Sequence, residues 1–135
     1  MFKFTKNIAS VASASVTSGS GQVNAATTGP GPAANEYTVN LTGVGNEQTL
    51  IVTLDGVQDT TGATANGVQA AMGVLYTDVN SSRRVDSGDV FLVRQENGKA
   101  VTGTNFRNDV NASGRIDSGD VFLTRRQNPS GLSQP

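Results

Sequence analysis

Hydrophobic and polar positions alternate over two short stretches in the first half of the chain. Residues 36–41 (EYTVNL) and 48–54 (QTLIVTL) combine this alternation with β-branched side chains, which favours β-strands. Residues 43–46 (GVGN) between them are turn-forming, so the two strands are expected to pair as a hairpin. Residues 67–75 (GVQAAMGVL) predict a weaker last strand. The pattern therefore predicts a small antiparallel β-domain of four or five strands over residues 1–75.

This β-region resembles the C-terminal part of an immunoglobulin-like sandwich. Such a sandwich usually has about seven strands, so four or five strands predict a fragment of one, although any small sheet shows the same pattern. Residues 1–16 leave two interpretations open. The basic start and the following apolar residues suggest a secretory signal, whereas the serines that interrupt residues 8–16 favour a β-strand.

The pattern changes near Leu75, where an internal repeat begins. Residues 78–94 (DVNSSRRVDSGDVFLVR) return as residues 109–125 (DVNASGRIDSGDVFLTR), an offset of 31 positions. Repetition at a fixed offset predicts two copies of one supersecondary unit packed on each other. The second half of each copy predicts a helix, near residues 87–97 and 118–127. Ser87 and Ser118 are the expected N-caps, with Asp89 and Asp120 as first-turn acids.

Each copy begins with a loop whose oxygen-bearing side chains stand at positions 1, 3, 5, 9 and 12. These residues are Asp78, Asn80, Ser82, Asp86 and Asp89 in the first loop, and Asp109, Asn111, Ser113, Asp117 and Asp120 in the second. Calcium takes six to eight oxygen ligands, and this spacing lets a coiled loop direct them inward. Position 7 supplies a backbone carbonyl, from Arg84 and Arg115. The sequence therefore predicts two calcium ions. Simple helix capping accounts for the second half of each loop but leaves the Asp-x-Asn start unexplained.

A loop followed by a single helix, present twice, resembles the type I dockerin over about residues 76–127. The resemblance implies two antiparallel EF-hand-like loop–helix units, with a third short helix around residues 102–106. It also implies that Val85 and Ile116, at loop position 8, meet as a short β-bridge. The fold expected for the whole chain is mixed: an N-terminal antiparallel β-domain, then an all-α dockerin-like pair of calcium loop–helix units. The expected boundaries are residues 1–75, residues 76–128 and a flexible tail at residues 129–135.

Positions 5 and 6 of the loops depart from the family pattern. Ser82 and Ser113 stand at position 5, where dockerins usually have Asp or Asn, so calcium affinity is expected to be lower in both loops. Position 6 normally carries Gly in a left-handed conformation, and the first loop has Arg83 there whereas the second has Gly114. The second site is therefore expected to be the tighter one.

The two helices carry more apolar residues than a two-helix core can cover. Residues 90–93 surround the first helix, and Thr124 relieves one apolar position on the second. The expected core contacts are Val90 and Val121, supported by Val85, Ile116 and Val93. Some of the apolar residues Phe91, Leu92, Phe122 and Leu123 are therefore expected to stay exposed, beside Arg94, Gln95, Arg125 and Arg126. Apolar residues rimmed by Arg are typical of a protein interface. The alternative is that they pack on the N-terminal β-region.

The dockerin resemblance implies a cohesin-like partner, bound through positions 10 and 11 and through basic residues further along each helix. Positions 10 and 11 are Ser87 and Gly88 in the first copy and Ser118 and Gly119 in the second. Glycine at position 11 departs from the family's usual hydroxyl or apolar residue. Cohesin specificity is therefore open.

Composition narrows the function further. The net charge of −1 predicts no nucleic-acid partner, and no apolar run is long enough to predict membrane insertion. The absence of histidine and cysteine removes the commonest general base and the usual zinc ligands. The predicted function is a non-catalytic docking module of a secreted or cell-surface, polysaccharide-degrading protein, monomeric when unbound.

Two other functions compete with docking. One is a calcium-clamped cap that stabilises its own β-domain and binds no partner. The other is a fragment of a glycoside hydrolase that uses two of the carboxylates Glu36, Glu47, Asp55 and Asp59.

Overall fold

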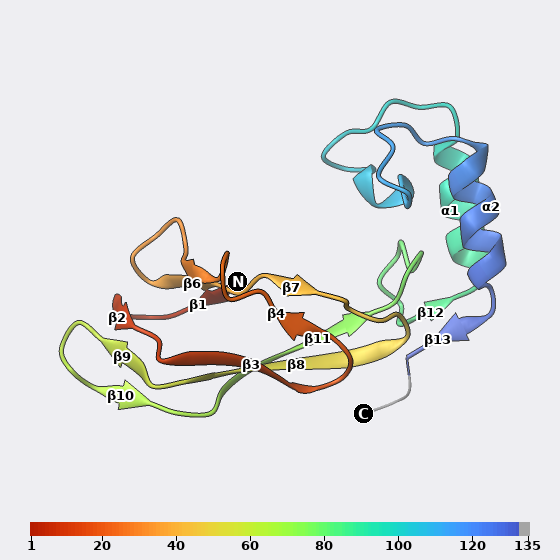
Figure 1. Cartoon of the computed structure of the whole chain (residues 1–135). Helices are drawn as coiled ribbons and strands as arrows, with labels where there is room; N and C mark the ends of the chain where they lie inside the picture. The colour runs from red at the N-terminus through yellow and green to blue at the C-terminus, as the bar shows by residue number, and fades with distance from the viewer. Residues whose placement is uncertain (133–135) are drawn as a thin grey trace. The chain divides into compact units, whose positions relative to one another are not determined.

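The computed structural model describes residues 1–132, and the chain divides into two compact units, Met1–Met72 and Gly73–Pro135. The first unit is built from short β-strands (Figure 1). They are β1 (Phe2–Lys3), β2 (Ile8–Ser10), β3 (Ser13–Ser18), β4 (Gln22–Val23), β5 (Gly29–Pro30), β6 (Glu36–Thr38), β7 (Leu41–Thr42), β8 (Gln48–Asp55), β9 (Val57–Asp59) and β10 (Thr64–Ala65). Strand β11 (Val68–Val74) begins in the first unit and ends in the second.

Strand β8 is the centre of the first unit. It lies between β3 and β11, and it pairs antiparallel with β3 from Ser13↔Asp55 to Ser18↔Ile51. Leu50, Val52 and Leu54 alternate along β8 and are almost fully buried. This alternation is the one that predicted the strand, and the apolar face it creates forms the core.

The expected hairpin between residues 36–41 and 48–54 is wrong. Residues 36–41 divide between two strands: β6 pairs with β1 and β5, and β7 pairs with β4. The residues expected to form the hairpin turn contact the N-terminal segment instead: the N–H of Gly45 donates to the carbonyl of Ser20 at 3.3 Å. The side chain of Gln48 also bonds the backbone of Ser20. Pairing with the N-terminal strands therefore replaces the local hairpin.

The N-terminal segment forms strands β1, β2 and β3, so the β-strand interpretation of its conformation is confirmed. Figure 1 shows β1, β4, β6 and β7 lying over the layer of β3 and β8. The antiparallel β-fold predicted for this region is present. Its assignment to the immunoglobulin-like class stays a prediction.

The second unit contains two helices that lie side by side and antiparallel, α1 (Ser87–Glu96) and α2 (Ser118–Gln127) (Figure 1). A 3₁₀ turn, η1 (Phe106–Asn108), lies between them in sequence, just after the short helix predicted around residues 102–106. The buried core consists of Val93, Ile116 and Val121, with Val79 and Val101 packed against it. No helix within residues 1–132 is long and apolar enough to cross a membrane.

The prediction of an all-α second half is wrong. Strand β12 (Arg84–Val85) pairs antiparallel with β13 (Ser130–Gly131), and an isolated antiparallel bridge joins Ala100 to Arg115. Over residues 1–132 the protein has thirteen strands and only two α-helices, so β-structure predominates.

Within residues 1–132, Val85 and Ile116 do not form the expected bridge with each other. Instead, each loop pairs with the segment that follows the other copy's helix: Val85 with Ser130, and Arg115 with Ala100. The two pairings are equivalent, because Arg84↔Gly131 becomes Arg115↔Ala100 when the two copies are exchanged. Gly131 belongs to the segment predicted to be a flexible tail, which is in part strand β13. Residues 133–135 of that tail lie outside the described residues.

Candidate functional site

The first four proposed ligand positions converge in each loop. In the first loop, the Oδ1 atoms of Asp78 and Asn80 both accept a hydrogen bond from the N–H of Ser82, at 3.0 and 2.9 Å. The hydroxyl of Ser82 donates to the carbonyl of Arg84 at 2.9 Å. Oxygen atoms from positions 1, 3, 5 and 7 are therefore close neighbours.

The second loop repeats this geometry. The N–H of Ser113 donates to the Oδ1 atoms of Asp109 and Asn111, both at 2.9 Å, and its hydroxyl donates to the carbonyl of Arg115 at 3.2 Å. The two loops thus take one conformation, although they differ at positions 4, 6 and 8. The shared conformation follows from the ligand-type residues that the two loops have in common.

The aspartates at position 12 close the loops from the helix side. Asp89 and Asp120 have no exposed surface. One oxygen of Asp89 accepts from the N–H of Val79 at 3.0 Å, and the other accepts from the N–H of Asp86 at 3.0 Å. Backbone N–H groups compensate a buried carboxylate's charge only in part, so a cation beside it is favourable.

The N-cap of each helix lies one residue earlier than predicted. The N-caps are Asp86 and Asp117, not Ser87 and Ser118, and each forms a capping box with the aspartate three residues later. Asp86 and Asp117 accept from the N–H groups of Gly88 and Gly119, both at 2.7 Å. A carboxylate is favoured here because it compensates the positive end of the helix dipole. Asp at position 9 is therefore a helix cap as well as a candidate ligand.

Position 6 has the left-handed conformation predicted for it in both loops. Arg83 has φ 69° and Gly114 has φ 83°. Their N–H groups donate to the second oxygens of Asp78 and Asp109, at 2.9 and 2.8 Å. This hydrogen bond fixes the orientation of the position-1 carboxylate. In the first loop it requires a left-handed backbone at Arg83, which is strained for a residue other than glycine.

No group of three or more His, Cys, Asp or Glu side chains placed to hold a metal ion occurs in the described part of the chain, residues 1–132. Asp86 and Asp117 direct an oxygen toward the start of their helices. Each loop therefore combines carboxylates with amide, hydroxyl and carbonyl oxygens. All of these are hard oxygen donors of the kind calcium uses, so the donor set fits that ion.

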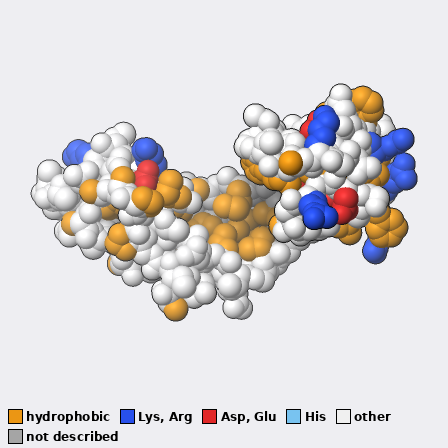
Figure 2. All heavy atoms as spheres, turned by 90° about the horizontal axis from the view of Figure 1, so that it is seen from above, with side chains coloured by type: hydrophobic (Ala, Val, Ile, Leu, Met, Phe, Trp, Pro, Cys, Tyr) orange, Lys and Arg blue, Asp and Glu red, His pale blue; other side chains and the backbone are white. Residues whose placement is uncertain are grey.

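The helices present one aromatic residue each to solvent. Phe91 is 63% exposed and Phe122 is 59% exposed, which confirms their predicted exposure, whereas Leu92 and Leu123 are half-buried. The guanidinium of Arg126 lies over the Phe122 ring, 5.7 Å from its centroid. Arg94, Gln95 and Arg125 are exposed, as are Ser87 and Ser118, while Gly88 and Gly119 are half-buried. Figure 2 shows basic and hydrophobic side chains gathered on this unit.

Two core positions differ from the prediction. Val90, an expected core contact, is only half-buried, whereas Thr124 is fully buried; Val93, expected as a supporting core residue, is fully buried as well. The hydroxyl of Thr124 donates to the carbonyl of Asp120 at 2.9 Å, which satisfies it inside the helix. A threonine inside a helix can bury its hydroxyl in this way, because the backbone carbonyl four residues earlier is within reach.

The connection after α1 is fixed by polar contacts. Lys99 forms an ion pair with Glu96 at 2.8 Å, and the amide of Asn105 donates to the other Glu96 oxygen at 3.1 Å. The Lys99 bond, with the Asn105 bond second, lowers the pKa of Glu96. This connection supplies Ala100, the partner of the second loop.

The geometry of the second unit agrees with a comparison against known families. Residues 76–127 match the family model of the dockerin type I domain. Type I dockerin domains are non-catalytic docking modules that bind calcium, and residues 76–127 are called the dockerin region because of this match. No curated protein and no solved structure matches the chain. The match begins at residue 76 and does not test the β-region before it.

Proposed function

We propose that the dockerin region binds two calcium ions and docks the chain to a cohesin-like domain of another protein. The observation that carries the proposal is that both loops gather oxygen atoms from positions 1, 3, 5 and 7 beside a fully buried position-12 aspartate. In each loop those four positions, with the aspartates at positions 9 and 12, supply the ligands. Calcium contributes the positive charge that holds these oxygens together.

The helix faces are the proposed contact surfaces. Phe91 and Phe122 are more than half exposed, and exposed aromatic residues beside Arg are enriched where proteins meet. The first face comprises Ser87, Gly88, Phe91, Leu92, Arg94 and Gln95; the second comprises Ser118, Gly119, Phe122, Leu123, Arg125 and Arg126. In the bound complex, Phe91 or Phe122 is expected to be the central apolar anchor.

The wider setting follows from the family and is also proposed. Dockerin domains occur in extracellular or cell-surface proteins, and we infer the same location for this chain, in a protein that degrades polysaccharides. A calcium-clamped cap without a partner is the second candidate function. The half-buried state of Leu92 and Leu123 favours it, because it leaves less apolar helix surface for a partner.

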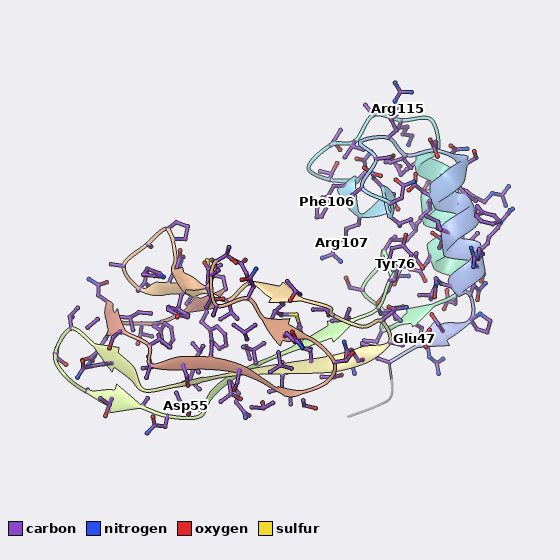
Figure 3. The ribbon with its side chains drawn as sticks, in the orientation of Figure 1. Glu47, Asp55, Tyr76, Phe106, Arg107 and Arg115 are labelled. Carbon is purple, nitrogen blue, oxygen red and sulfur yellow. The ribbon has the colours of Figure 1, made fainter. Side chains whose placement is uncertain are left out.

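The four carboxylates considered for glycosidase chemistry are Glu36 in β6, Glu47 just before β8, Asp55 in β8 and Asp59 in β9. Glu47 and Asp55 lie at opposite ends of β8 (Figure 3). Glu36 forms an ion pair with Lys3, and Asp59 forms one with Lys6. A glycosidase pair needs two carboxyl groups within about 10 Å on either side of a substrate. Glu36, Asp59 and Asp55, whose Oδ1 accepts from the N–H of Gly67, are instead engaged in contacts of the β-unit.

Binding to a panel of cohesin domains, with calcium and with excess chelator, tests the proposal. Docking predicts capture of at least one cohesin in calcium and its loss in chelator. Phe122→Ala with Arg125→Ala should weaken binding only modestly, because the first face remains. Adding Phe91→Ala and Arg94→Ala should abolish binding while helicity and calcium uptake persist. Phe106→Ala, at an equally exposed phenylalanine outside both helices, is the matched control.

Capture of no cohesin by the calcium-loaded chain would favour the cap. Normal binding by the fourfold variant would show that the helix faces are not the contact surface.

A further inference from the structure

A groove lies between two segments of the dockerin region that are counterparts in the repeat. Residues 75–79 precede and enter the first loop, and residues 106–110 stand 31 positions later. The groove is lined by all of the first segment and by all of the second except Asn108. Its volume is about 380 Å³. Neither helix contributes to it, so it is separate from the proposed docking faces.

Thr77 in the groove lining has three unusual properties. It is only 5% exposed, its φ of 69° is left-handed, and its buried hydroxyl has no hydrogen-bond partner. A β-branched residue is strained at positive φ, and an unpaired buried hydroxyl adds a further cost. Its counterpart Asn108 also has a buried oxygen, Oδ1, without a partner. Strain and an unsatisfied polar atom at one residue are typical of a binding site.

Aromatic and basic side chains form the rim. Tyr76 is 37% exposed and Phe106 is 55% exposed, and each comes from a different copy of the repeat. Arg107 donates to the hydroxyl of Ser81, which holds the guanidinium beside the groove. Figure 3 shows Tyr76, Phe106 and Arg107 on the side of the unit opposite the two helices. The groove thus combines ring faces with hydrogen-bonding groups.

The size of the groove argues for a small ligand. A stable protein interface takes about 20 to 30 residues from each partner, whereas small-molecule sites begin at about 300 Å³. The lining charges argue against an ion, because the acids Asp78 and Asp109 stand beside the base Arg107. An anionic ligand would be repelled by the carboxylates, and a cationic ligand would be repelled by the guanidinium. A neutral ligand with one apolar face and several hydroxyls satisfies both the rings and the polar groups.

We propose that this groove binds a neutral pyranose sugar, at a site distinct from the protein-docking faces. The apolar C–H face of the sugar lies against Phe106 or Tyr76. Its hydroxyls donate to and accept from the Thr77 hydroxyl, and they accept from Arg107. Sugar binding therefore supplies the hydrogen bond that the Thr77 hydroxyl lacks.

Amide chemical shifts of the calcium-loaded full chain, recorded during titration with cellobiose, maltose and xylobiose, test the proposal. At least one sugar should produce saturable shifts at residues 76–77 and 106–107. Phe106→Ala should weaken that binding about tenfold, because an aromatic contact is lost. Phe122→Ala removes an equally exposed ring outside the groove and should leave the affinity unchanged. Shifts produced by inorganic phosphate or by a proline-rich peptide, with none from the sugars, would overturn the proposal.

Thr77→Val separates a binding role from a structural one. The substitution keeps the shape and removes the unpaired hydroxyl, so the unit should become more stable to urea. If the hydroxyl bonds the sugar, the same variant should bind more weakly. Unchanged sugar affinity in a stabilised Thr77→Val chain would contradict the assigned contact. Cohesin binding should be unaffected in both groove variants, so failure here is distinguishable from failure of the docking proposal.

Discussion

Val93 and Thr124 occupy the same place in the two copies of the repeat, and both are fully buried between the helices. Only Thr124 carries a hydroxyl there, and it bonds back to the carbonyl of Asp120. One site in the core thus exists in an apolar and a polar version within a single chain.

Substituting each of these residues by its counterpart in the other copy should change the stability of the dockerin region in opposite directions. Burial of a hydroxyl costs about 1–3 kcal/mol, and one hydrogen bond returns about 1 kcal/mol of it. Thr124→Val should therefore raise the unfolding free energy of the calcium-loaded dockerin region by about 1 kcal/mol, and Val93→Thr should lower it by a similar amount. Urea unfolding followed by circular dichroism measures both. A loss of stability in Thr124→Val would show that the hydroxyl's bond outweighs its burial.

Removal of calcium should unfold the dockerin region and leave the β-unit folded. Without the ion, the buried carboxylates of Asp89 and Asp120 lose their compensating charge. Far-UV circular dichroism should lose its helical signal in excess chelator and regain it when calcium is added. Asp89→Asn with Asp120→Asn serves as the control, since this variant should no longer respond to calcium. A helical signal that chelation leaves unchanged would contradict the calcium assignment.

Arg83→Gly should tighten the first calcium site. Arg83 holds φ 69°, which costs a non-glycine residue about 1–2 kcal/mol, so glycine should increase affinity about fivefold or more. Gly114→Arg places the same strain in the second loop and should weaken it comparably. Calorimetric titration of the three chains compares the sites directly. Equivalent sites in the parent chain would disprove the ranking of the two loops.

Asp59 should make the β-unit sensitive to acid. Two hydrogen bonds hold the pKa of Asp59 far below its ordinary value of 3.8: the one from the Thr61 hydroxyl has the larger effect, and the one from the Lys6 ammonium comes second. Because the folded pKa is depressed, the stabilisation is complete well above pH 3.8 and is lost as the pH falls below that value. Asp59→Asn should lower the unfolding free energy of the β-unit at neutral pH. It should also reduce the further loss of stability as the pH falls. Urea unfolding across the pH range measures it, with Glu47→Gln as a control at an exposed acid.

The second helix face should bind an acidic partner more tightly than the first. Arg126 on the second face corresponds to Gln95 on the first, so the two faces differ by one positive charge. Chains with only one intact face should differ in cohesin affinity, and added salt should reduce the difference. Arg126→Gln should make the two faces equal. A difference that persists unchanged in high salt would point to the Phe122 contact instead of the charge.

Part of the β-unit and most of each calcium loop could be predicted from local sequence. The alternation along β8 predicted a buried strand, and the loop spacing predicted which oxygens converge, because both patterns depend on residues close together in the chain. The same locality explains α2, whose bounds agree with the prediction. The N-caps were wrong by one residue because Asp86 and Ser87 are both good caps, and only the backbone conformation chooses between them.

The sequence by itself determined the repeat, the candidate ligands and the exposed phenylalanines, since composition and spacing specify these locally. Tertiary structure alone decided which strands pair: β8 with β3 across more than thirty residues, and Val85 with Ser130 after the other helix. It also decided that Thr77 is buried with an unpaired hydroxyl. Strand partners and buried polar atoms depend on which distant backbone groups compete for the same hydrogen bonds, and no local pattern records the outcome of that competition.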